Sequence, residues 1–441
     1  MLAALVGVGP ARVQGDTGPR AVGRAGATLV SDDGAPALLN NPGGLVRRSA
    51  LRLQVGLVVD DRDLRFRALG DAPEVEDSSA PGTRPALAVI GTLGPVVAGL
   101  AYLEPEEHSR ALPAAVPGRV FDATEAGRLP HRYGGIAVAQ RDQRLAAGAA
   151  VRAGDWLGAG VSVDLGRTRL RERRHVWAGD DGAQLPGDPS RDLDVQVRGA
   201  GLSVGAGAGV LIAPPTAPVE LAASARYTYR GRLRGPAGAA RVGNTTDQPV
   251  DPEVALDQPE AEVTLPDVLA LRAGARYLGQ RVLVEAAAAL VLTPRAGTAW
   301  RLSGIGVDDS ALGAAALTEL PRLYDPGRYG AVQVAADVEV VAGFAWLTAG
   351  YGYRSSASRP GRLSPGYAEP GRHTAALGVE VYRAGITLTL GYSRSVAPAH
   401  TVTSTALRAA NPYRAGTVPV GLGRYRLARD SVGVAVEVAW E

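Results

Sequence analysis

The feature that most constrains the fold of this chain is a regular alternation of short and long connections between apolar segments. Short joints such as Gly279-Gln280 and Ala384-Gly385 alternate with long polar stretches such as 175–195 and 235–258 from one end of the chain to the other. An antiparallel meander with tight turns at one end and long loops at the other has this arrangement. Transmembrane β-barrels are built in this way.

The apolar segments carry the side-chain period of a β-strand. In 157–165 and 332–340, Val, Leu and Ala occupy every second position and alternate mainly with Gly, Ser, Asp, Gln and Glu. Because successive side chains of a strand point to opposite faces, one face of each segment is apolar and the other is small or polar. A sheet in hydrocarbon must have no free edge, so this pattern favours a closed barrel. A soluble sandwich or solenoid does not explain the alternating connections.

The fold class that follows is all-β: a transmembrane antiparallel barrel of about 14 strands, an even number as in single-chain bacterial barrels. The fourth strand is the least regular, because 140–144 interrupts its apolar pattern. The expected strands are 49–67, 84–92, 95–105, 131–152, 156–173, 197–213, 218–232, 261–278, 281–293, 329–341, 344–356, 372–383, 386–397 and 424–440.

Composition excludes several classes of function. The chain has 0 Cys, which excludes disulfide scaffolds, thiolate metal sites and cysteine catalysis. Its net charge of +3, with acids and bases mixed throughout, argues against a nucleic-acid partner. The 5 histidines have no metal-ligand spacing and no Gly-x-Ser-x-Gly motif accompanies them. A pair such as Ser393 and His373 has no supporting pattern. We therefore expect no enzyme activity, catalytic residue, metal site or cofactor.

The chain before the first strand has a different character. Residues 1–11 are mostly small and apolar and look like the remnant of a signal peptide, the alternative being an apolar tip. Residues 12–48 do not alternate and are rich in Gly, Asp, Asn and Pro. A segment of this length either hangs free or folds into the lumen as a hatch. The expected organisation is a hatch at 12–48 and a barrel at 49–441.

Several motifs resemble the long-chain fatty-acid transporter family of bacterial outer membranes, which includes channels for toluene-like hydrocarbons. The motifs follow the family's order along nearly the whole chain. They are Gly23-Arg24-Ala25, Asp32-Asp33, Asn41-Pro42-Gly43-Gly44-Leu45, Asp155-Trp156-Leu157 and Leu265-Pro266-Asp267.

The resemblance implies transport of a hydrophobic small molecule across the outer membrane by a multi-pass, monomeric barrel. In this family extracellular loops capture the ligand, a hatch rearranges, and a kink in strand three opens the wall sideways. The hatch residues to which this role carries over are Asn41, Pro42, Gly43 and Gly44, the alternative being an ordinary turn. An open diffusion porin and a structural barrel are the remaining non-enzyme alternatives, and an open porin has no reason to carry a hatch.

Glycine and proline weaken strand pairing, so Gly94, Pro95 and Gly99 are the expected sites of the strand-three kink. The alternative for Gly94-Pro95 is a periplasmic turn.

Strand five continues beyond its apolar part with four arginines at the lipid-facing positions: Arg167, Arg169, Arg171 and Arg173. Above the apolar band, guanidinium groups suit the phosphates of lipopolysaccharide. The alternative is a solvated loop base.

Overall fold

The computed structural model describes residues 18–47, 50–70, 72–114, 129–180, 191–242, 252–293, 299–321, 331–356, 360–413 and 418–440. The expected signal-peptide remnant at 1–11 lies outside the described residues, as do 12–17 at the start of the expected hatch. None of the helices in the described ranges is long and apolar enough to cross a membrane.

The elements of the described residues are, in chain order, α1 (Pro19–Gly23), α2 (Ala37–Asn40), η2 (Pro42–Arg47), β1 (Leu51–Ala68), β2 (Glu74–Glu76), β3 (Gly82–Leu93), β4 (Val96–Ala111), η3 (Pro130–Tyr133), β5 (Ala137–Ala153), β6 (Leu157–Trp177), β7 (Asp192–Ile212), β8 (Val219–Arg230), β9 (Arg232–Arg241), β10 (Glu253–Thr264), β11 (Val268–Leu278), β12 (Val282–Leu292), β13 (Ala299–Asp309), β14 (Gly313–Ala316), β15 (Glu319–Pro321), β16 (Ala331–Ala342), β17 (Ala345–Arg354), η5 (Pro360–Arg362), η6 (Pro365–Tyr367), β18 (Arg372–Arg383), β19 (Ile386–Val402) and β20 (Gly423–Trp440).

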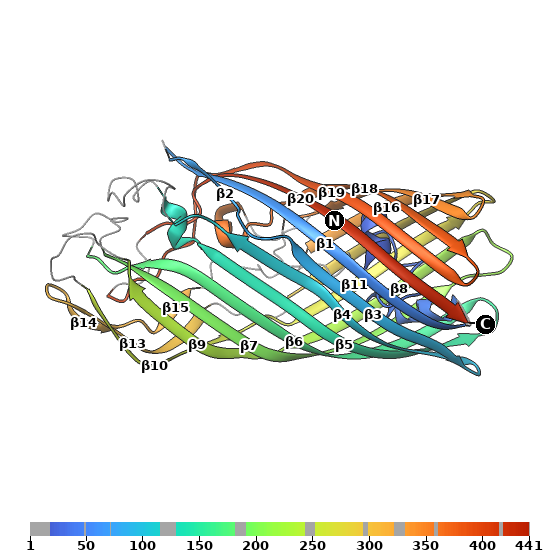
Figure 1. The fold of residues 1–441 in the computed structure, drawn as a ribbon, viewed down its shortest axis with the longest axis horizontal. Helices are drawn as coiled ribbons and strands as arrows, with labels where there is room; N and C mark the ends of the chain where they lie inside the picture. The colour runs from blue at the N-terminus through green and yellow to red at the C-terminus, as the bar shows by residue number, and fades with distance from the viewer. Residues whose placement is uncertain are drawn as a thin grey trace, which may run out of the picture.

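The strands form one closed antiparallel barrel whose strands run obliquely to its long axis (Figure 1). Closure is made by β1 and β20, which pair over their full lengths from Leu51↔Trp440 to Ala68↔Gly423. Over the described residues the wall has 14 strands, because β8 with β9, β10 with β11, and β12 with β13 each continue one another, and the short strands β2, β14 and β15, which each pair with one neighbour only, are not counted. The predicted fold class is confirmed, and the pairing of β1 with β20 removes the two edges that an open sheet would have.

The outer face carries the expected apolar belt. Half-exposed Leu and Val side chains occupy every second position along successive strands. Among them are Leu57, Leu87, Leu100, Val163 and Leu347. Between them, Gly, Ala, Ser and charged residues face the lumen. This is the alternation that the sequence predicted for a barrel with a lipid-facing exterior.

Several strands extend further toward the long-loop end than expected. The long polar stretch 235–258 contains most of β9 and the start of β10, and the connection expected between the strands 281–293 and 329–341 contains β13, β14 and β15. The expected fourth strand begins too early, because its first residues form η3 and β5 starts only at Ala137. Above the lipid belt the wall is not bounded by hydrocarbon, so its residues lose the apolar alternation by which strands were recognised.

Candidate functional site

The N-terminal segment 18–47, hereafter the plug, lies inside the barrel near the short-turn end (Figure 1). Nearly all of its residues are buried. It packs against inward faces on several sides of the wall: α1 against β18, β19 and β20, and η2 against β5, β6 and β7. Leu38, Leu39 and Leu45 share an apolar cluster with wall alanines and leucines of β3, β4, β5, β7 and β8. The position is that of the expected hatch.

Arg24 is the electrostatic centre of the plug. Its guanidinium is 2% exposed and forms ion pairs with three wall carboxylates: Glu380 at 3.2 Å, Asp337 at 3.4 Å, and Glu339. Glu339 and Asp337 lie on β16 and Glu380 lies on β18. Charge-assisted contacts of this kind are strong, and a buried guanidinium needs them to offset its lost hydration. The arginine of the sequence motif Gly23-Arg24-Ala25 therefore docks the plug to the wall.

Two further arginines of the plug contact wall acids. Arg20 pairs with Glu380 at 2.8 Å and with Asp33 of the plug at 3.2 Å. At the other end of the plug, Arg47 pairs with Glu220 of β8 at 2.6 Å. The plug thus presents cations to a wall that supplies carboxylates, and this complementarity selects one seating.

The plug backbone is also bound by wall side chains. The carboxylate of Glu285 on β12 accepts hydrogen bonds from the N–H groups of Val30 at 2.7 Å and Ser31 at 3.1 Å. On β1, Gln54 Oε1 accepts the Ala35 N–H at 2.7 Å. These wall groups satisfy plug N–H donors that no plug helix or sheet pairs.

One plug carboxyl is poorly solvated. Burial raises the pKa of Asp32 to about 7, an effect that nearby Arg20 opposes. Asp32 Oδ1 accepts the Gly34 N–H at 3.1 Å. A raised pKa means that the folded plug favours the protonated acid, so deprotonation between about pH 4 and 7 removes stability from the seated plug.

The predicted hatch residues lie at the start of η2. Asn41 is fully buried and its side-chain amide donates to the carbonyls of Leu29 and of Val210 on β7, both at 3.3 Å. Its Oδ1 accepts the Gly43 N–H at 3.2 Å. Pro42 and Gly44 are buried beside it. These hydrogen bonds hold the turn against the wall, and a part of the four residues in gating stays a prediction.

Wall glycines make the seat into which the plug fits. A Cβ on Gly160 of β6 would lie 2.5 Å from the Pro42 oxygen, and one on Gly350 of β17 would lie 2.5 Å from the Arg24 carbonyl carbon. Gly391 and Gly433 similarly lie beneath the plug backbone. The sequence pattern indicated small lumen-facing residues, and their role is to let the plug backbone approach the wall.

The expected kink of strand three is wrong at two of its three positions. Gly94 and Pro95 form the hairpin turn between β3 and β4, and Gly94 has φ +61°. A positive φ is the backbone conformation for which glycine is preferred, so these residues serve the turn. Gly99 lies in a regular part of β4, opposite Ile90 and Gly148 and near Leu38 of the plug.

The irregular point of this strand is instead at Pro105. The pairing of β4 with β5 shifts register between Leu103 and Glu106, and the ladder between β3 and β4 extends only as far as Ala86↔Leu103. Proline has no N–H to donate to a ladder and is found at bulges. In the sequence, Pro105 was the residue that could have indicated this interruption.

Side chains bridge this interruption in the ladder. Arg84 of β3 approaches the Pro105 carbonyl at 3.5 Å, and Arg62 of β1 donates to the Glu107 carbonyl. Beyond it the wall is joined again, where Ser78 N–H donates to the Ala111 carbonyl at 2.8 Å. The interruption is a short section of wall between β3 and β4 that is held by side chains where the ladder is missing.

A large apolar cluster lies at the long-loop end of the lumen. Inward side chains of β6, β7, β9, β10 and β13 form one large buried cluster that includes Trp300, and Tyr367 of η6 packs into it. The hydroxyl of Tyr367 and the indole N–H of Trp300 both donate to Glu172, the latter at 2.9 Å. Segments that lie between the strands therefore fold into the barrel mouth.

Among the cavities lined by described residues, two small ones border the plug, with volumes of about 30 and 20 Å³. Each has room for no more than a few water-sized groups. A hydrocarbon chain does not fit in either of them, so passage beside the seated plug by this route requires movement.

The predicted arginine row lies on the outer face. Arg167, Arg169, Arg171 and Arg173 are all exposed on β6, directly beyond the apolar Val161, Val163 and Leu165. Arg173 pairs with Asp194 at 2.8 Å. Arg198 of β7, which the sequence analysis did not include, is exposed and lies opposite Arg171.

The Ser393 and His373 pair considered above is not assembled. His373 is exposed on β18 and accepts or donates a 2.6 Å hydrogen bond with Tyr351, whereas Ser393 is buried on the inward face of β19. The two side chains lie on opposite faces of the wall, because their strand positions have opposite parity in the ladder.

Solved structures of other proteins share the fold of this chain. The chain is similar to a FadL homologue of Pseudomonas aeruginosa, with a TM-score of 0.71, 14% identity and 99% of each chain covered. It is similar to the toluene transporter TodX of Pseudomonas putida, with a TM-score of 0.65, 18% identity and 98% of this chain and 99% of that chain covered. It is also similar to the toluene transporter TbuX of Ralstonia pickettii, with a TM-score of 0.64, 16% identity, and 96% of this chain and 98% of that chain covered. No protein-family model and no curated protein sequence matches the chain.

Proposed function

We propose that this chain is an outer-membrane carrier of hydrophobic compounds, such as long-chain fatty acids or aromatic hydrocarbons, gated by its plug. The observation that carries the proposal is a plug docked inside a closed barrel by buried ion pairs, with Arg24 at their centre. A permanently open pore has no use for such a device. The solved structures of similar fold are described as a FadL homologue and toluene transporters, and this supports the same class of cargo.

The proposed route has three stages. A hydrophobic ligand is captured among the apolar side chains at the long-loop end, where each buried CH₂ is worth roughly 0.8 kcal/mol. Movement of the plug then opens the lumen beyond. The ligand leaves sideways through the interrupted section between β3 and β4 beside Pro105, where few backbone hydrogen bonds have to break. An apolar ligand that leaves in this way enters the membrane without crossing water.

Uptake by cells tests this proposal against the open porin and the structural barrel. Cells that lack their own carrier and express this chain are expected to take up labelled oleate or toluene, and a charged hydrophilic solute of similar mass is expected to stay outside. The purified protein is expected to show no large steady conductance in a planar bilayer. Rapid entry of the hydrophilic solute with a steady open conductance would contradict the carrier.

The side exit is tested by the same uptake assay. Pro105→Val restores a backbone donor and a strand-favouring residue, so the ladder of β4 is expected to become continuous and most of the uptake to be lost. The matched control is Pro236→Val in β9, which lies in a strand far from this section. Unchanged uptake by the Pro105 variant would place the exit elsewhere.

The outer arginines are proposed to hold lipopolysaccharide phosphates. Arg167, Arg169 and Arg171, with Arg198 beside them, form a cationic surface directly beyond the apolar belt, where lipid head groups lie. Native mass spectrometry of the purified barrel is expected to show retained lipopolysaccharide, and R167Q/R169Q/R171Q is expected to lose it.

The control for this surface is R65Q/R67Q/R426Q on β1 and β20. It removes the same number of exposed arginines from a region where Asp63 and Glu76 already lie near Arg65, both at 3.4 Å. Lipopolysaccharide retention that is equal in the two triple variants would show that the β6 surface is merely solvated.

A further inference from the structure

Within the part of the chain that the structure describes, Arg272 on β11 is a buried cation without a hydrogen-bond partner. It points into the lumen, where its residue is 6% exposed, and it lies in the ladder between Ser224 of β8 and Ala289 of β12. Its Nε and both terminal nitrogens lack hydrogen-bond partners among the described residues. The other buried arginines nearby differ: Arg144 pairs with Asp142 and Asp164, and Arg226 pairs with Asp164.

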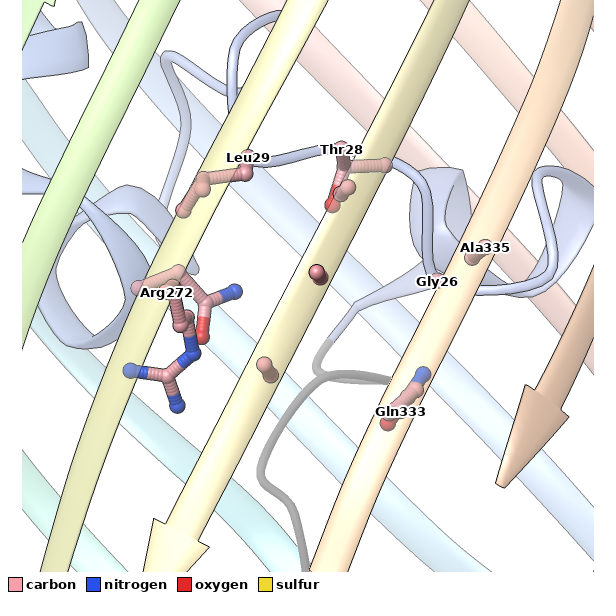
Figure 2. A pocket seen from close by; sticks show the side chains of 10 residues that line it. Gly26, Thr28, Leu29, Arg272, Gln333 and Ala335 are labelled. Carbon is pink, nitrogen blue, oxygen red and sulfur yellow. The ribbon is translucent and has the colours of Figure 1, made fainter. Parts of the chain in front are cut away.

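Arg272 lines the cavity of about 30 Å³ beside the plug. Figure 2 shows Arg272 on one side of this cavity, Gln333 of β16 on the other, and the plug residues Gly26, Thr28 and Leu29 crossing beyond them. Asn40 of the plug also lines it. The remaining lining is alanine: Ala287, Ala288, Ala289 and Ala335. None of the described residues that line the cavity is a carboxylate, so none of them neutralises the guanidinium.

We propose that this cavity is a binding site for one small, singly charged anion, held by Arg272 between the wall and the plug. A buried unpaired guanidinium is strongly unfavourable, and an anion beside it supplies both the charge and the hydrogen-bond acceptors that it lacks. The amide groups of Asn40 and Gln333 and the hydroxyl of Thr28 are the neutral polar groups of the lining, and each has a donor.

The size of the cavity limits the occupant. A volume of about 30 Å³ accommodates a halide ion or a carboxylate head group and excludes a larger polyanion. Chloride and the carboxylate end of an organic acid are both small, singly charged hydrogen-bond acceptors. The experiment therefore has to distinguish these two occupants. The site does not depend on the proposed transport function.

An anion at this place joins two parts of the molecule. Its surroundings include Thr28, Leu29 and Asn40 of the plug, and Arg272 and Gln333 of the wall. A ligand that binds only the seated arrangement stabilises that arrangement by mass action. Occupancy is therefore expected to hold the plug in place, and loss of the anion is expected to loosen it.

Bromide gives a direct test, because its anomalous scattering locates it. Crystals of the full chain grown in sodium bromide are expected to show an anomalous peak within hydrogen-bond reach of the Arg272 guanidinium. Adding decanoate to such crystals distinguishes the sources: loss of the peak assigns the site to carboxylates as well, and its persistence assigns it to halides. Ordered water in place of a bromide peak, with no carboxylate density after decanoate, would overturn the proposal.

A measurement in solution tests the same proposal through the response of the wild-type plug to chloride, which does not depend on how well a variant folds. Hydrogen exchange of the plug amides is expected to slow as chloride replaces sulfate at constant ionic strength, and R272Q is expected to lose this response. The matched control is R152Q, because Arg152 donates to the Val46 carbonyl of the plug at a distant contact. A chloride response that persists in R272Q, or that is lost equally in R152Q, would contradict an anion at Arg272.

Discussion

Replacing Arg24 by glutamate is expected to release the plug from its seat while leaving the barrel closed. The variant places a fourth carboxylate among Asp337, Glu339 and Glu380, where the native guanidinium forms ion pairs with all three. Breaking a buried ion pair by removing one partner costs about 3–5 kcal/mol, and reversing the charge adds repulsion. The barrel ladder contains no bond to Arg24, so its closure is not affected. We expect transient conductance steps in planar bilayers and rapid hydrogen exchange of the plug amides.

The control and the rescue separate docking from general damage. Arg65→Glu reverses a charge on an exposed residue far from the plug and is expected to leave both measurements unchanged. Arg24→Gln removes the charge without reversing it and is expected to give an intermediate effect. Arg24→Glu combined with Glu339→Arg restores an opposite pair and is expected to recover part of the plug protection. Wild-type exchange and conductance in Arg24→Glu would show that these ion pairs do not hold the plug.

The barrel was predictable because membrane physics imposes a repeated pattern. Each strand that crosses hydrocarbon has to place apolar side chains at alternate positions, as in 157–165 and 332–340, and the short turns mark where strands reverse. The pattern weakens beyond the lipid belt, which is why β13, most of β9 and the start of β10 were assigned to loops. Their inward residues belong to an apolar cluster with the folded mouth, and no sequence neighbour reveals that partner.

The seat of the plug was only half predictable. The motifs around Arg24 and Asn41 indicated the correct segment, because a long polar stretch before the first strand either hangs free or folds into the lumen. Their partners Glu285, Asp337 and Glu380 come from strands far apart in the sequence, and the register that brings them together follows from barrel closure. A charged residue at a lumen-facing position within an apolar strand was the available signal, since such a charge requires a partner inside.

The strand-three prediction failed for a local reason. Gly94 and Pro95 are suited both to a turn and to a kink, and the strand length decides between these roles. Once β4 extends to Ala111, the interruption falls in its middle, where Pro105 is the residue without a backbone donor. Lumen-facing Gly99 instead gives space to Leu38 of the plug.

Valine at Gly160 and Gly350 is expected to displace the plug without disturbing the wall. A Cβ at Gly160 would lie 2.5 Å from the oxygen and 2.6 Å from the carbon of the Pro42 carbonyl group. At Gly350 it would lie 2.5 Å from the carbon and 2.7 Å from the oxygen of the Arg24 carbonyl group. The obstructing atoms are backbone atoms of the plug, which have no rotamer into which they can move. Valine itself favours strands, so each wall strand is expected to pair as before.

The two glycines contact opposite ends of the plug, so the double variant is expected to act more strongly than either single one. Overpacking costs about 1–3 kcal/mol at one site, and sites this far apart contribute additively. Plug amide exchange measures the effect, with Gly238→Val as the matched control, because a Cβ there meets nothing within 4 Å. If the double variant kept wild-type plug protection, the plug would have to sit further from β6 and β17 than the glycine seat implies. Fast exchange with an intact barrel would instead establish that wall glycines, together with the buried ion pairs, define where the plug rests.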